Sequence, residues 1–241
     1  MDKIRQKLKM YAHHPASFLL ALLVWISAIF TAVTLIFIVG YILIKGVPHL
    51  TPQLFELEYN SENVSMFPAI INTIFMIMLS LLVAGPLGIF AAVYLVEYAK
   101  KGNKLVSVVR VTAETLTGIP SIVYGLFGML FFVTTLRWGY SMLAGAFTLA
   151  IMVLPVIMRT TEEALLAVPD TYREASFGLG AGKLRTIFVV ILPSAVPGIF
   201  SGVILSIGRI VGETAALMYT AGTVAELPDS VMSSTRTLSV H

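Results

Sequence analysis

Long uncharged runs dominate the hydrophobic pattern of this chain. Four stretches contain no Asp, Glu, Lys or Arg, at residues 18–44, 63–96, 115–136 and 138–158. A fifth, residues 186–219, is interrupted only by Arg209 and Glu213. A helix needs about 20 predominantly apolar residues to cross a bilayer. The pattern therefore predicts five membrane spans, at about 18–44, 68–96, 115–136, 138–158 and 196–219.

The edges of these runs carry further signals. Pro68 suits the first turn of the second helix, and Pro86 is expected to kink that helix. Four basic residues precede the first run, which is also the layout of a signal peptide. The apolar core of a signal peptide is only about 7–15 residues long, so we predict a retained first helix after an N-terminal segment at residues 1–17.

Lys and Arg residues are unevenly divided between alternate connections. With the N-terminus in the cytoplasm, twelve lie on the cytoplasmic side and three lie outside, namely Lys45, Arg137 and Arg236. The positive-inside rule therefore predicts a cytoplasmic N-terminus. Five spans then place residues 220–241 outside as a polar tail. Because this tail contains no closing helix, we expect the natural protein to be longer and to have a sixth, final helix.

Composition excludes a soluble fold. The chain is 57% hydrophobic and 12% charged, whereas soluble domains carry about 25% charged residues. The net charge of +3 fits the topology signal, and we expect a lipid bilayer and no nucleic acid as a partner. The absence of cysteine excludes disulfides and thiol chemistry.

Enzyme motifs are scarce. The sequence has no P-loop and no H-E-x-x-H pattern. His13 and His14 are adjacent at a predicted membrane boundary, where an interfacial role is expected rather than a metal site. We therefore expect no catalytic residue, no bound cofactor or metal, and no ATP site in this chain.

The connection at residues 159–192 is the longest one on the predicted cytoplasmic side. Pro169 ends a helical turn, and Thr171 with Glu174 predicts a capping box that starts a new helix. Gly180 and Gly182 are expected to end it. One face of this helix carries Tyr172, Ala175, Ser176 and Leu179. The pattern fits an ordinary amphipathic connector, and it equally fits a surface that another protein binds.

Three short elements of this connection carry a resemblance to a family. Glu174-Ala175-Ser176, then Gly180, then Ile191-Leu192-Pro193 resembles the EAA loop of ABC importer permeases. Ser176 replaces the second alanine of that loop, and Ile191 directly precedes Leu192. Residues 118–128 and 208–215 resemble the phosphate-importer permease subunits, and the similarity runs from about Phe67 to the end.

The resemblance implies an all-α membrane protein, a multi-span helical bundle of the type I ABC importer (MetI-like) class in the bacterial inner membrane. It implies alternating access driven by two cytoplasmic ATPase subunits that hold ATP and Mg²⁺. The other implied partners are a second homologous permease, as a heterodimer, and an extracytoplasmic phosphate-binding protein. The implied ATPase-coupling residues are Tyr172, Glu174, Ala175, Ser176, Leu179 and Gly180.

Arg209 and Glu213 are the charges predicted inside the fifth span. A charge at the bilayer centre costs about 2.5–3.5 kcal/mol on insertion scales, and residues four apart share a helix face. The two side chains could simply neutralise each other. Alternatively, the planar fork of Arg209 could bind phosphate in transit while Glu213 orients it. In the resembled family, the corresponding Arg and Glu are implicated in transport.

Two other functions remain open from the sequence. One is an importer permease for another oxyanion or small solute, which the coupling loop cannot distinguish. The other is a membrane enzyme or scaffold without a transport role. An enzyme would need paired catalytic groups at membrane depth, and this sequence offers one Arg–Glu pair there.

Overall fold

The computed structural model describes residues 15–100 and 102–241, and helices account for most of them. The α-helices are α2 Pro15–Gly46, α3 Phe67–Val93, α4 Lys104–Thr117, α5 Ser121–Gly128, α6 Met142–Leu166, α7 Asp170–Gly178, α8 Lys183–Thr186, α9 Leu192–Val211 and α10 Ala215–Thr220. Three π-helical segments extend them, η3 Tyr94–Tyr98, η4 Met129–Thr135 and η5 Ile187–Ile191. The chain divides into two units, residues 1–52 and 53–241.

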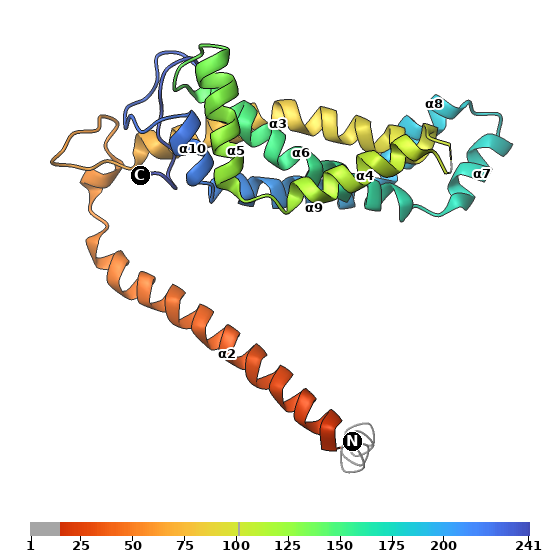
Figure 1. Cartoon of the computed structure of the whole chain (residues 1–241), viewed down its shortest axis with the longest axis horizontal. Coiled ribbons are helices and arrows are strands. Elements are labelled where there is room, and N and C mark those ends of the chain that lie inside the picture. The colour runs from red at the N-terminus through yellow and green to blue at the C-terminus, as the bar shows by residue number, and fades with distance from the viewer. Residues whose placement is uncertain (1–14, 101) are drawn as a thin grey trace. The chain divides into compact units, whose positions relative to one another are not determined.

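The first unit contains α2 (Figure 1). Its sequence is apolar around the whole circumference of the helix. This helix contains the predicted first span, residues 18–44, and none of its described side chains is buried within the protein. A helix that is hydrophobic all round is stable only when apolar material covers it. Most of the predicted segment 1–17, with His13 and His14, lies outside the described residues.

In the second unit, α6 is the central helix. The most apolar window of α6 is 67% buried, against 22% for the span that begins with α3 and 28% for the span that ends with α9. Helices α3 and α9 pack along it (Figure 1). Met152, Val153 and Ile157 of α6 are fully buried in this core. Membrane helices of this kind associate by close side-chain packing rather than by a hydrophobic driving force.

Small residues bring α6 and α9 into close contact. A Cβ atom on Gly198 would lie 2.5 Å from the Cβ of Ala164, and one on Gly202 would lie 2.7 Å from the Cβ of Thr160. The two glycines are four residues apart on α9, and Thr160 and Ala164 are four residues apart on α6. This is the spacing of a small-xxx-small interface. Glycine is therefore required at both α9 positions for this separation of the two helices.

The predicted third span, residues 115–136, is wrong as a single helix. Helix α4 ends at Thr117, and the next helical segment begins at Ser121 after a bend of 103° (Figure 1). Pro120 cannot donate a backbone hydrogen bond, and its ring disfavours a helical conformation at Ile119. The break places α4 beside α6 and lets α5 run in another direction. Four helices are long and apolar enough to span a membrane, or five if this bent pair counts as one.

The last two spans have different limits from those predicted. Helix α6 continues to Leu166. The predicted span 138–158 therefore ends too early, and the predicted loop begins too early, at residue 159. The last long helical stretch runs over Lys183–Val211 instead of residues 196–219. The predicted limits were wrong because they were set by charged residues, and a helix can extend beyond its apolar part. The second span agrees with its prediction, since α3 begins at Phe67 with Pro68 in its first turn.

The C-terminal segment after α10 packs against the bundle through hydrogen bonds. The backbone N–H groups of Met142 and Leu143 donate to Ser233 and Val231. Asn72 of α3 donates through Nδ2 to the carbonyl oxygens of Glu226 and Arg236. These bonds attach residues 226–236 to the ends of α3 and α6. That end of the bundle, which also holds α10, is called the α10 end below.

Candidate functional site

Helix α7 lies at the other end of the bundle, which we call the α7 end (Figure 1). A Schellman turn closes this helix, in which the N–H of Gly180 donates to Phe177 and the N–H of Ala181 donates to Ser176. Gly180 has φ +81°, a conformation that favours glycine. The prediction that Gly180 ends the helix is therefore confirmed, and α8 follows at Lys183–Thr186.

The predicted capping box is wrong. Helix α7 begins at Asp170 after Pro169, and no side chain caps its N-terminus. Pro169 fixes the extended conformation before the helix (φ −57°, ψ 139°), so the helix starts one residue before the predicted cap, Thr171. The Asp170 carboxylate accepts a hydrogen bond from Arg173 instead.

The six predicted coupling residues divide into an outward group and an inward residue. Tyr172, Glu174, Ala175, Leu179 and Gly180 are exposed, with Leu179 at 90% relative exposure. Ser176 is buried, and its hydroxyl shares a hydrogen bond of 2.8 Å with Thr186 of α8. The expected single face is thus split, because Ser176 faces the helix that leads into α9. The five outward residues remain available to a partner.

Arg173 joins α7 to two long helices. Its Nη2 and Nε atoms donate to Glu97 Oε1 at 2.7 and 3.1 Å. Its Nη2 also donates to the Leu165 carbonyl, and its Nη1 donates to the Val168 carbonyl and to Asp170 Oδ1. Glu97 lies in η3, which extends α3, and Leu165 lies in the last turn of α6. The three donor atoms of the guanidinium therefore all have partners.

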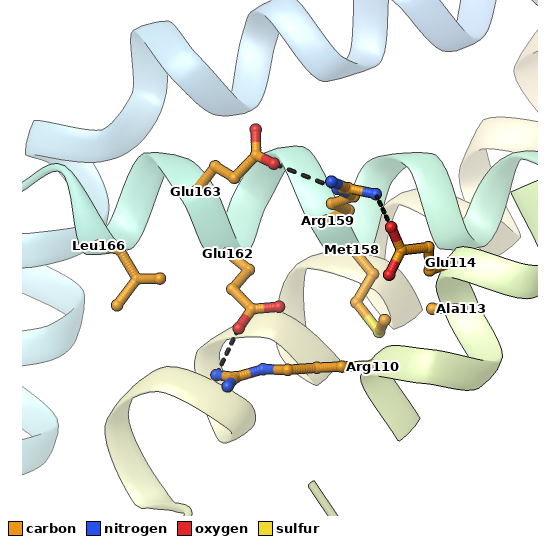
Figure 2. A pocket seen from close by; sticks show the side chains of 8 residues that line it. All are labelled: Arg110, Ala113, Glu114, Met158, Arg159, Glu162, Glu163 and Leu166. Carbon is orange, nitrogen blue, oxygen red and sulfur yellow. Dashed lines mark hydrogen bonds and ion pairs between the residues drawn. The ribbon is translucent and has the colours of Figure 1, made fainter. Parts of the chain in front are cut away.

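A charged cleft of about 280 Å³ opens between α4 and α6 (Figure 2). Arg110 of α4 reaches Glu162 of α6 at 2.5 Å. Arg159 of α6 points between Glu114 and Glu163, at 3.5 and 3.2 Å. The ion pairs between α4 and α6 run in opposite directions, so each helix contributes one cation and one anion. This arrangement holds α4 against the central helix.

Arg209 and Glu213 do not share a helix face as expected. Helix α9 ends at Val211 with Gly212 as its C-cap, so Arg209 lies in the last turn rather than in the middle of a span. Among the described residues, no ion pair joins Arg209 to Glu213. The buried carboxylate of Glu213 accepts a hydrogen bond from the backbone N–H of Ala216. Glu213 therefore stabilises the start of α10.

The fold brings the two segments 118–128 and 208–215 together at the α10 end. Helix α10 packs on α5, where a Cβ on Gly125 would lie 2.8 Å from the Cα of Ala216. Tyr124 of α5 is buried. Its hydroxyl donates to the carbonyl of Leu116 at the end of α4. Arg209 lies in the last turn of α9, a few residues before α10 begins at Ala215.

Sequence reasoning missed the interhelical ion pairs. From the sequence, Arg110, Arg159 and Arg173 are only topology signals, yet each contacts a glutamate on another helix. The available signal was the presence of Glu97, Glu114 and Glu162 at the ends of apolar runs, opposite basic residues. Partner choice could not be predicted, because it depends on which helices are neighbours.

Comparison with known proteins identifies the family. Residues 84–237 match the family described as binding-protein-dependent transport system inner membrane component. The chain is 37% identical over 199 residues to a probable ABC transporter permease protein, YqgI, of Bacillus subtilis, covering 82% of this chain and 67% of that protein. It is 40% identical over 205 residues to the phosphate transport system permease protein PstA of Pasteurella multocida, covering 84% and 72%.

A solved structure supports the fold. The methionine ABC transporter MetNI, in an inward-facing conformation, contains a chain that matches with a TM-score of 0.51 and 23% identity. The match covers 61% of this chain and 68% of that chain. Together with its apolar helices, the family makes this chain a multi-pass inner-membrane protein. The chain belongs to the binding-protein-dependent transport system inner membrane component family, and it is a permease subunit of an ABC importer.

Proposed function

We propose that this chain is a permease subunit of an importer for inorganic phosphate. The observation that carries this proposal is the 40% identity to the phosphate permease of Pasteurella multocida, which extends over 84% of this chain. The chain supplies a path through the membrane and hydrolyses no ATP itself. ATP and Mg²⁺ bind to two partner ATPase subunits in the cytoplasm.

Helix α7 is the ATPase-docking element in this proposal. Its exposed residues, among them Tyr172, Ala175 and Leu179, offer an apolar surface at one end of the bundle. The excess of Lys and Arg on that side supports a cytoplasmic α7 end and a cytoplasmic N-terminus. A second permease and an extracytoplasmic phosphate-binding protein complete the assembly.

Arg209 is the proposed phosphate contact. It lies in the last turn of α9, and no ion pair to it is found among residues 15–100 and 102–241. A guanidinium without a carboxylate partner keeps its fork of donors for two phosphate oxygens. Glu213 acts indirectly, by fixing the start of α10 beside Arg209.

A permease for another oxyanion or small solute is the second candidate. The Bacillus subtilis relative is named only as a probable ABC transporter permease, with no solute in its name. The ion pairs and the α7 geometry are compatible with any solute. Only a transport measurement separates the two candidates.

The test combines assembly with transport. The chain, carrying Ala175→Cys and an affinity tag, is purified from its native source, and the associated subunits are identified by mass spectrometry. Crosslinking from position 175 is expected to capture an ATPase. Proteoliposomes of this complex with its binding protein are then expected to take up radiolabelled phosphate when ATP is inside. Competition by unlabelled phosphate but not by sulfate supports the substrate, whereas ATP-driven uptake of a different solute alone contradicts it.

A further inference from the structure

We propose that Glu97 and Arg173 form a clamp that transmits the movement of α7 to α3. The clamp makes Arg173 a positioning residue for coupling. This inference rests on the proposed function, because α7 must be the helix that the ATPase moves.

The contacts of α7 explain why a clamp is needed. Helix α7 packs mainly on α8 and η5, and the Ser176–Thr186 hydrogen bond attaches it to the same side. Its connection to α6 consists of a short stretch that contains Pro169. The side chain of Arg173 reaches from α7 to the ends of α3 and α6. There it contacts Glu97 in η3, which extends α3, and the carbonyl of Leu165 in α6.

The geometry of the clamp is specific for arginine. The five N–H groups of a guanidinium point in fixed directions, and the five hydrogen bonds of Arg173 use Nε, Nη1 and Nη2. The side chains of Arg173 and Glu97 are only 16% and 9% exposed, so water screens their attraction weakly. A contact of this kind holds two elements in one relative orientation.

Arg173 also satisfies carbonyl groups at the end of α6, and this could be its whole role. A charge-exchanged pair separates the two roles. In the Glu97→Arg, Arg173→Glu double variant, the ion pair between α3 and α7 can form again. Glutamate at position 173 cannot donate to the carbonyls of Leu165 and Val168, so the cap of α6 stays lost.

The experiment measures phosphate uptake and ATP hydrolysis in proteoliposomes of the complete transporter. Arg173→Gln and Glu97→Gln are expected to lower the phosphate transported per ATP hydrolysed by at least ~5-fold, the lower range of typical coupling between sites. The charge-exchanged variant is expected to regain most of this ratio. Asp170→Asn is the matched control, because it removes the charge of an exposed carboxylate that pairs with Arg173 within α7 itself; its ratio should equal that of the unaltered protein.

The outcomes distinguish the clamp from the proposed function. If Ala175→Cys does not crosslink to the ATPase in the unaltered background, the docking role of α7 is wrong. If it crosslinks but both single variants keep the normal ratio, the clamp is wrong. The clamp is also wrong if the charge-exchanged variant assembles and remains as uncoupled as the single variants. If the single variants fail to assemble, an assembled and coupled charge-exchanged variant supports the clamp, and its failure overturns it.

Discussion

Substitution of Gly202 by alanine tests the packing of the bundle most directly. The new Cβ would lie 1.9 Å from Thr160 Oγ1 and 2.7 Å from Thr160 Cβ. Rotation of the threonine can move its Oγ1 atom but leaves its Cβ in place. Because Cβ contacts below 3.0 Å essentially never occur, the backbones of α6 and α9 must separate. Overpacking of this kind costs about 1–3 kcal/mol.

The expected result is a lower unfolding temperature in detergent, measured by intrinsic fluorescence and by size-exclusion after heating. For a chain of this size, each kcal/mol corresponds to about 2–4 °C. Gly208→Ala is the matched control on the same helix, because a Cβ there meets nothing within 4 Å. Alanine in a helix interior is usually favoured over glycine by about 0.5–1 kcal/mol. Equal unfolding temperatures for the two variants would refute the close α6–α9 contact.

Three further predictions concern the two ends of the bundle. Gly180→Leu forces a side chain into a left-handed conformation at a cost of about 1–2 kcal/mol. Because this strain disturbs the end of α7, the proposed docking helix, ATP hydrolysis should continue with little uptake. Gly182→Leu is the control, since Gly182 has φ −72°, and it should transport normally. Arg209→Lys should keep assembly but lose most phosphate uptake in proteoliposomes, and Arg209→Gln with Glu213→Gln should not restore it; normal uptake by that double variant would contradict the anion contact. Arg110→Ala leaves Glu162 nearly buried without its cation, which should destabilise the protein by about 1–3 kcal/mol in thermal unfolding, whereas Arg159→Ala breaks exposed pairs and should cost less than ~1 kcal/mol.

The apolar runs predicted the existence of the membrane helices but not all of their limits. The first two spans match α2 and α3 closely, because both have apolar sequences that end at loop signals. The third prediction failed at Pro120, where a local backbone effect outweighs continuous hydrophobicity. The limits of α6 and α9 were missed because helical structure continues through charged residues such as Glu163 and Lys183.

The candidate site was predictable where it depends on neighbouring residues in the sequence. The turn at Gly180 follows from local backbone chemistry, and it was found. The contacts of Ser176 and Arg173 depend on α8, α3 and α6, which the helix pattern alone does not place. The Arg209–Glu213 pairing was expected from a spacing of four, but that spacing has meaning only within one continuous helix, and α9 ends between the two residues.

Helix α9 connects the two proposed sites physically. At one end, η5 joins it to Thr186, which contacts Ser176 of α7. At its other end α9 carries Arg209. The distance along the helix from Thr186 to Arg209 is about 35 Å at the rise per residue of an α-helix. Gly198 and Gly202 hold α9 against α6 between these ends, and Arg173 attaches α7 to the end of α6. In the proposed mechanism, a shift of α7 acts on α6 and α9 together, and it reaches Arg209 only if the contact between these two helices stays close. For this reason Gly202→Ala should lower the phosphate transported per ATP as well as the unfolding temperature.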